Sequence, residues 1–144
     1  MIDEQDERIA KILFVDDSED IDAEGLDVSE ENLEKYLQYL KDHIEFPCQV
    51  KSVGEFGWEE YYTFGPGNTK EYEKLKKIRP SYADRFILLN FEDEIDSDYG
   101  IMVKVQRVSD NKRFTLDLEK LEPTDKKSKN YQLINDYSVW FVNN

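Results

Sequence analysis

The sequence predicts an α+β fold in which N-terminal helices pack on a small curled antiparallel sheet, or on a partly open SH3-like barrel. Two observations support this prediction. Apolar residues recur at helical spacing within residues 4–44, and they alternate with polar residues, as in half-buried strands, within residues 86–118. We expect one domain over residues 1–144, with a helical acidic part at 1–46 and a mainly β part at 47–144.

Two amphipathic helices are expected in the first third of the chain. The first, at residues 4–14, has three apolar side chains on one face, namely Ile9, Ile12 and Leu13. The second begins after Ser29, whose hydroxyl suits a helix N-cap, and ends before Pro47. Its apolar stripe, which we expect to cover the sheet, consists of Leu33, Tyr36, Leu37, Leu40 and Ile44.

The centre of the predicted sheet is a meander of three strands between residues 86 and 122. Apolar and polar residues alternate most clearly in its second strand, at residues 101–106. A polar turn at residues 109–112 joins the second and third strands. Residues 48–53, which lie between a proline and a glycine, predict a further strand.

Three other segments are assigned from local pattern. Residues 58–64 are rich in aromatic side chains and predict a second strand of the sheet. Residues 69–78 predict a short helix, whose inward side chains are expected to be Tyr72, Leu75 and Ile78. The C-terminal residues 130–141 are expected to form a helical turn followed by a last strand.

The net charge of −14 is concentrated in two short segments. Residues 16–31 contain nine carboxylates and residues 92–98 contain five, and neither segment contains Lys or Arg. The acids elsewhere equal the 19 Lys and Arg residues in number, so the rest of the chain is neutral. Charge that served solubility would be spread over the surface, so this localisation indicates two functional segments.

The composition disfavours several classes of protein. Cys48 is the single cysteine, so the chain cannot form an internal disulfide. The acidic N-terminus lacks the features of a signal peptide, and no apolar run reaches the ~20 residues of a membrane helix. Contacts to nucleic acid or to anionic membranes require clustered Lys and Arg. We therefore expect a cytoplasmic protein that binds neither nucleic acid nor membrane.

Residues 92–98, the acid loop, are interpreted as a site for a hard cation. Carboxylates crowded between two strands repel one another, and a bound cation removes that repulsion. Calcium accepts six to eight oxygen ligands in tolerant geometry, whereas magnesium, expected to bind more weakly, demands near-octahedral geometry. Zinc is disfavoured because His43 and Cys48 are too few ligands. The candidate ligands of the acid loop are Glu92, Asp93, Glu94, Asp96 and Asp98.

The first acidic segment partly matches the EF-hand calcium loop at residues 20–31. Acids stand at positions one, three and five, glycine at six and glutamate at twelve. However, Glu24 is long for position five, and Asp27 stands where a hydrophobic residue normally pairs. We therefore interpret residues 16–31 as an acidic segment that is not an EF-hand. Whether it holds a cation or forms a solvated face stays open.

Short motifs along the chain resemble the cyanobacterial calcium-binding protein (CcbP-type) family. The N-terminal motifs are Glu7-Arg8-Ile9-Ala10, Val15-Asp16, Tyr39-Leu40 and Phe46-Pro47. The later motifs are residues 86–91, Glu92-Asp93-Glu94, Val103-Lys104-Val105, residues 114–122 and Asp136 to Trp140. The resemblance covers nearly the whole chain, apart from extra residues around 18–30 and an insertion-like segment within 55–82.

This resemblance implies a small acidic calcium binder, a buffer or sensor, with a barrel-like sheet, no EF-hand and no catalytic activity. By matching position it implies four candidate ligands, which are Asp16, Glu92, Glu94 and Asp93. Three neighbours of the first are further candidates, namely Asp17, Glu19 and Asp20. Whether the two acidic segments share one ion stays open.

Two other functions are considered from the residues. An interaction module that binds a basic protein partner, for example by mimicking nucleic-acid charge, would also concentrate its acids. A hydrolase would need a pocket with a strongly perturbed carboxylate. The single histidine and the lack of a glycine-rich nucleophile elbow argue against the hydrolase.

Overall fold

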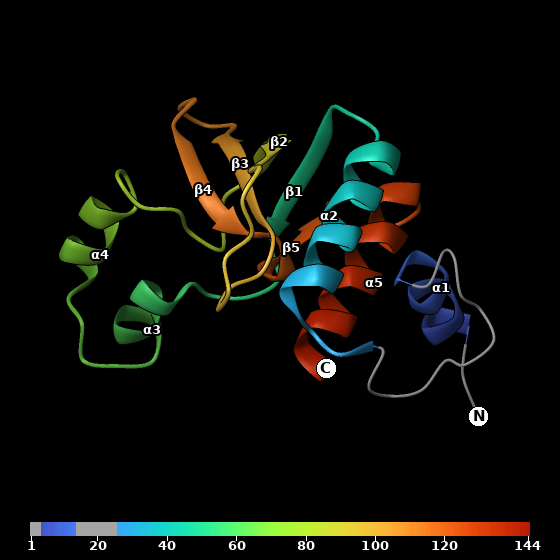
Figure 1. Cartoon of the computed structure of the whole chain (residues 1–144). Helices are drawn as coiled ribbons and strands as arrows, with labels where there is room; N and C mark the ends of the chain where they lie inside the picture. Colours follow the sequence, from blue (N-terminus) through green and yellow to red (C-terminus); the bar gives the residue numbers. More distant parts are fainter. Residues whose placement is uncertain (1–3, 14–25) are drawn as a thin grey trace.

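A computed structural model describes residues 4–13 and 26–144 (Figure 1). Its centre is a five-stranded antiparallel sheet with the order β4-β3-β2-β1-β5. The predicted α+β class is confirmed, but β4 and β5 are free edges and the sheet does not close into a barrel. The strands are β1 (Cys48–Ser52), β2 (Phe86–Phe91), β3 (Met102–Arg107), β4 (Arg113–Asp117) and β5 (Leu121–Pro123).

The predicted meander corresponds to β2, β3 and β4. In β3 every second side chain is buried, as the alternation requires: Val103, Val105 and Arg107. In β2 the register shifts between Leu88 and Asn90, and this irregularity returns Phe91 to the buried face. The predicted polar turn closes through Asn111, whose φ of 62° is a left-handed conformation that asparagine tolerates.

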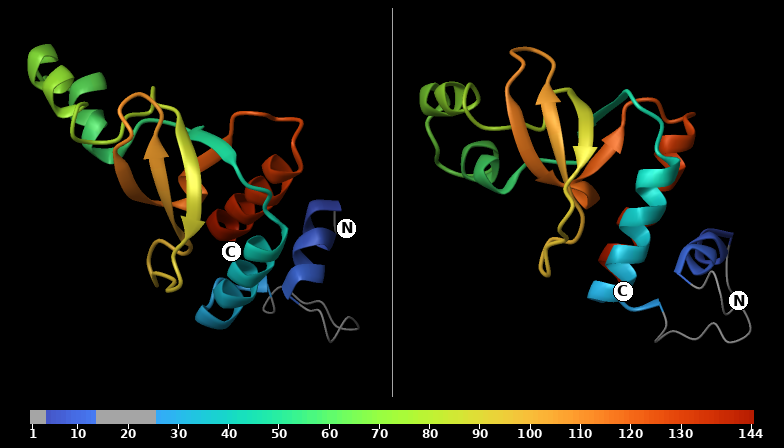
Figure 2. Two further views of the ribbon diagram at one scale, coloured as in Figure 1. Left: turned by 90° about the horizontal axis from the view of Figure 1, so that it is seen from above. Right: turned by 45° about the horizontal axis from the view of Figure 1, so that its top comes forward.

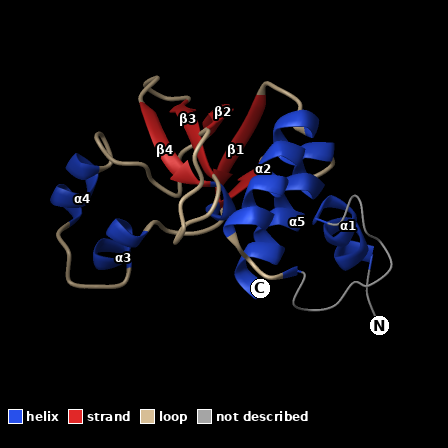
Figure 3. Ribbon diagram, in the orientation of Figure 1, coloured by secondary structure: helices blue, strands red, loops and turns tan. Residues whose placement is uncertain are grey.

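A helical layer covers one side of the sheet (Figures 1 and 3). It contains α1 (Glu4–Leu13), α2 (Glu30–His43) and α5 (Lys129–Asn143), with α1 packed on the outer side of the other two. Ser29 caps α2 as predicted, because its Oγ accepts a hydrogen bond from the Asn32 amide at 3.2 Å. All eight predicted apolar positions of the two N-terminal helices are buried. No described helix is long and apolar enough to cross a membrane.

The prediction for the C-terminus was wrong, because residues 130–141 belong to one continuous helix, α5. Ser128 caps this helix by accepting a hydrogen bond from the Tyr131 amide at 3.2 Å. Ile134, Tyr137 and Trp140 are fully buried at a spacing of three, which is the spacing of a helix face. The β-branched and aromatic residues near the end suggested a strand, but the burial of one helix face against the rest of the protein favours the helix. The Trp140 and Tyr36 rings stack with centroids 5.0 Å apart.

The aromatic segment 58–64 is also helical, so its assignment as a strand was wrong. It forms α3 (Gly57–Thr63), in which Trp58 and Tyr62 lie one turn apart on the same face. Both rings contact Tyr72 of α4 (Thr69–Leu75), whose helical state was predicted. Ile78 was expected to be inward but is 60% exposed, because α4 ends before it.

The helices α3 and α4 form a lobe that projects from the sheet on the side away from α1 (Figure 2). We define this lobe as residues 56–82. Glu59 holds it together: its carboxylate is fully buried and accepts four hydrogen bonds. The donors are the amides of Phe56 (3.1 Å) and Tyr82 (2.8 Å) and the hydroxyls of Tyr72 and Ser81 (both 2.7 Å).

Arg107 joins the lobe to the sheet. Its guanidinium is 2% exposed and donates hydrogen bonds to two carboxylates, Asp84 (2.9 Å) and Asp110 (2.7 and 3.0 Å). It also donates, at 2.9 Å each, to three backbone carbonyls that follow α4, those of Lys76, Lys77 and Arg79. The hydrogen bonds from Arg107 lower the pKa of the Asp110 carboxyl to about 2.

Candidate metal centre

The acid loop extends the hairpin formed by β2 and β3. The Glu92 amide donates to the Met102 carbonyl at 2.9 Å, and Asp96 and Gly100 exchange two backbone hydrogen bonds of 2.8 Å. Gly100 is required here, since its φ is 76° and a Cβ atom would collide with the side chains of Tyr137 and Phe141. Backbone hydrogen bonds and packing on α5 therefore hold both ends of this loop.

Asp96 orders the tip of the loop. Its Oδ1 accepts hydrogen bonds from the amides of Asp98 (2.8 Å) and Tyr99 (2.9 Å). This arrangement leaves Oδ2 without a hydrogen bond to any described residue. Asp98 itself is exposed, as are Asp93 and Glu94. The loop therefore exposes carboxylate oxygens to solvent, while its own hydrogen bonds fix the conformation of its backbone.

Four of the five predicted loop ligands line one hollow of about 480 Å³. Asp98 is the fifth and does not contribute to this lining. Ile95 and two sheet residues, Met102 of β3 and Thr115 of β4, complete the hollow. The four acids are Glu92, Asp93, Glu94 and Asp96.

The side chains of this hollow are not arranged as a formed metal site. Among the described residues, no group of three or more His, Cys, Asp or Glu side chains is disposed to hold a metal ion. Two lysines instead approach the acids: Lys41 of α2 is 3.0 Å from Asp93, and Lys104 of β3 is 4.0 Å from Glu92. The Asp93 side chain is 95% exposed, so its ion pair is weak and exchangeable.

A second hollow, of about 290 Å³, connects the acid loop to the start of α2. Ile95 and Ser97 line it from the loop, and Val28, Ser29 and Glu30 line it from the other side. Residues 28–30 are the end of the first acidic segment. The described end of that segment therefore adjoins the acid loop, although the two lie more than 60 residues apart in sequence.

The other predicted ligands are not placed. Asp16, Asp17, Glu19 and Asp20 lie outside the described residues, as does the first half of the stretch at 20–31 that resembles an EF-hand. The two residues considered for zinc are separate: His43 is exposed on α2, and Cys48 is buried in β1. Burial raises the pKa of the Cys48 thiol, so the neutral form that packs in the core is favoured.

Sequence analysis missed the two lysines that approach the acids. Lys104 occupies a polar position of an alternating strand. The alternation predicts that its side chain is exposed, but it does not predict that the side chain approaches Glu92 at the end of β2. Lys41 comes from a helix more than 50 residues earlier, and only the packing of α2 beside the hairpin brings it to Asp93. Neither contact leaves a local signal in the sequence.

Comparison with known proteins gives similarities at two levels. A family model described as calcium binding, of CcbP type, matches residues 68–141, about half of the chain. The matched region includes the acid loop and all strands except β1. No curated protein matches the chain.

Two solved structures resemble the fold. A chain described as a calcium-binding protein in the calcium-binding form has a TM-score of 0.57 and 20% identity, and the match covers 96% of this chain and 90% of that chain. The crystal structure of Anabaena CcbP has a TM-score of 0.58 and 20% identity, with 94% and 87% covered. At this identity the matches establish a shared fold.

Proposed function

Because the chain belongs to the CcbP-type family of calcium-binding proteins, we propose that it binds calcium (Ca²⁺) at the acid loop. In this proposal the protein is a non-enzymatic buffer or sensor, and its site is not an EF-hand. The candidate ligands in the loop are Glu92, Asp93, Glu94 and Asp96, with Asp98 beside them. Asp16, Asp17, Glu19 and Asp20 are proposed to complete the coordination from the first acidic segment.

One observation carries the proposal: four carboxylates surround a single exposed hollow on a hairpin whose ends are held by backbone hydrogen bonds. Calcium binds carboxylates and backbone carbonyls at about 2.3–2.6 Å in flexible geometry. Exposed side chains such as Asp93 turn toward an ion at little cost, because only a weak surface ion pair is lost.

The second hollow supports a contribution from the first acidic segment. Residues 28–30 lie beside Ile95 and Ser97, so a chain leading into α2 passes close to the acid loop. The loop alone offers fewer carboxylates than calcium has coordination positions, and water or the nearby segment supplies the rest. Magnesium, which keeps its waters and demands regular octahedral geometry, is expected to bind this adaptable set less tightly.

Calorimetric titration of the protein with calcium tests the proposal, with magnesium and ionic-strength-matched sodium chloride as comparisons. We expect saturable binding of calcium and a rise in melting temperature that exceeds the rise in magnesium, since a ligand that binds only the folded state stabilises it. Equal small effects of all three salts would contradict the proposal.

The same titration, together with a polylysine probe, separates calcium binding from the alternative of a module that binds a basic partner. In such a module calcium would only screen the surface charges. The module would bind polylysine with an affinity that falls steeply as the salt concentration rises.

A further inference from the structure

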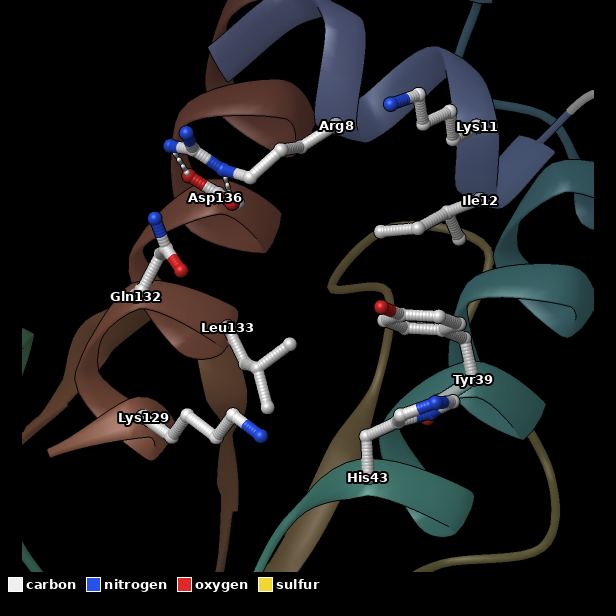
Figure 4. A pocket seen from close by; sticks show the side chains of 9 residues that line it. All are labelled: Arg8, Lys11, Ile12, Tyr39, His43, Lys129, Gln132, Leu133 and Asp136. Atoms are coloured by element: carbon white, nitrogen blue, oxygen red, sulfur yellow. Dashed lines mark hydrogen bonds and ion pairs between the residues drawn. The ribbon is translucent and has the colours of Figure 1, made fainter. Parts of the chain in front are cut away.

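A pocket with a cationic rim lies between α1, α2 and α5, away from the acid loop (Figure 4). Its volume is about 270 Å³. Three cations and one carboxylate line it, in a chain whose net charge is −14. The charged lining consists of Arg8 and Lys11 from α1 and Lys129 and Asp136 from α5.

The carboxylate of this pocket is already satisfied. Arg8 binds Asp136 through two hydrogen bonds, from Nε at 2.7 Å and from Nη2 at 3.0 Å, and the Gln5 amide adds a third at 2.9 Å. Asp136 is 3% exposed, so this network is a fixed wall of the pocket and fastens α1 to α5.

The two lysines of the pocket differ from Arg8. Neither Lys11 nor Lys129 forms an ion pair with any described residue. By contrast Lys41 of α2, in the same helical layer, pairs with Asp93. Lys129 is the first residue of α5, where the helix dipole adds positive potential. The rim of the pocket therefore attracts an anion that the described chain does not supply.

The rest of the pocket lining is mostly apolar or aromatic, and Gln132 of α5 is its remaining amide side chain. The Tyr39 and His43 rings stack with centroids 4.0 Å apart and an angle of 22° between their planes. The His43 Nδ1–H donates to the Tyr39 carbonyl at 2.8 Å, which fixes this pair. Ile12 and Leu133 face the pocket from the neighbouring helices (Figure 4).

We propose that this pocket binds a small organic anion, in which a phosphate or carboxylate meets Lys129 and a flat apolar group packs on Tyr39, Ile12 and Leu133. Lys11 lies at the opposite end of the pocket and adds positive potential to its rim (Figure 4). Lysine ammonium groups bind either headgroup as point charges. A mostly apolar cavity with a small number of polar groups at its rim is a common form of a small-molecule site.

NMR titration of the labelled full chain tests this proposal with four probes: phenyl phosphate, benzoate, inorganic phosphate and benzyl alcohol. We expect saturable amide shifts in α1, the end of α2 and the start of α5 with phenyl phosphate or benzoate. The tighter of the two identifies the headgroup. If benzyl alcohol bound as tightly as the aromatic anions, the pocket would be an apolar crevice without preference for an anion. If inorganic phosphate bound as tightly, the apolar walls would contribute nothing to binding. Either result would overturn the proposal, as would no saturation.

A matched pair of variants locates the site. Lys11→Gln with Lys129→Gln is expected to weaken binding of the preferred probe by about tenfold or more, since it removes the charge-assisted contact of the headgroup and the second positive charge of the rim. Lys70→Gln with Lys74→Gln changes the net charge equally on α4, at the far side of the molecule, and is expected to leave binding unchanged. If both variants weakened binding equally, the effect would come from the net charge of the protein, and the proposed site would be wrong.

Both pocket lysines are exposed, so the melting temperature is expected to stay close to that of the natural protein. Should the double variant melt early, the single Lys129→Gln variant repeats the measurement on an intact α1.

Discussion

The lobe and the acid loop both depend on charged side chains, but these side chains differ in burial and in the number of their hydrogen-bond partners. Glu59 of the lobe and Arg107, the β3 residue that joins the lobe to the sheet, are buried, and each has at least four hydrogen-bond partners at 3.1 Å or less. In the acid loop, Asp93 is almost fully exposed and its ion pair is with one lysine. Charges that serve the fold are buried and fully hydrogen-bonded, whereas the charges that we propose bind calcium are exposed and weakly paired.

The largest expected effect comes from removing the anchor of the lobe. Arg107→Ala leaves two carboxylates and three carbonyls without their donor, and we expect the free energy of unfolding to fall by about 3–5 kcal/mol. Chemical denaturation monitored by circular dichroism measures this loss. Calcium affinity is expected to change less than about twofold by titration, because Arg107 stands at the end of β3 remote from the acid loop.

Arg113→Gln is the matched control for that prediction. It removes the same charge from the neighbouring strand, where the exposed Arg113 side chain donates to Gln106 at 3.1 Å. We expect a change below about 0.5 kcal/mol. If Arg107→Ala is as mild as this control, the proposed anchor does not stabilise the fold.

The acid loop should show the opposite pattern. The double variant Asp93→Asn with Asp96→Asn is expected to weaken calcium binding by about tenfold or more, since it removes two carboxylate ligands. Without calcium its stability should be equal or higher. Repulsion within the loop falls, and the side-chain oxygen that remains at position 96 still accepts both amide hydrogen bonds. Calorimetric titration and thermal melting measure the two quantities, and unchanged affinity would remove the loop from the site.

The smallest expected effect concerns Lys41, which on this account competes with calcium for Asp93. Lys41→Gln frees the Asp93 carboxylate, and we expect calcium affinity to rise about two- to threefold, in keeping with the small energy of an exposed ion pair. Lys35→Gln, which removes an exposed lysine one to two turns earlier on α2, is the control. An equal rise in both variants would assign the effect to general charge.

The sequence predicted correctly those helices and strands in which apolar residues recur at a regular spacing. The central meander, α1, α2 and α4 follow from alternation or helical spacing, and Ser29 marks the start of α2. The errors at 58–64 and 130–141 arise where β-forming residues pack as helices. In α3 the buried Glu59, and in α5 the buried Tyr137, take partners far away in sequence, and no local propensity records such contacts.

The candidate site was predictable only in part, for the same physical reason. Crowding of carboxylates at 92–98 is local, so the acid loop could be identified from the sequence. The shape of the loop depends on the close packing of Gly100 against Tyr137, and its acid Asp93 pairs with Lys41. Both contacts join residues that are far apart in sequence. The adjacency of residues 28–30 to Ile95 likewise follows from how α2 packs beside the hairpin.

The account depends most on a calcium ion in the hollow of the acid loop, and a crystal structure of the natural protein grown with calcium tests this directly. We expect anomalous density there, with loop carboxylate oxygens at about 2.3–2.6 Å from the ion. The ion pair between Lys41 and Asp93 should then be broken. A hollow without density in crystals that hold calcium elsewhere, and with that ion pair intact, would contradict the account.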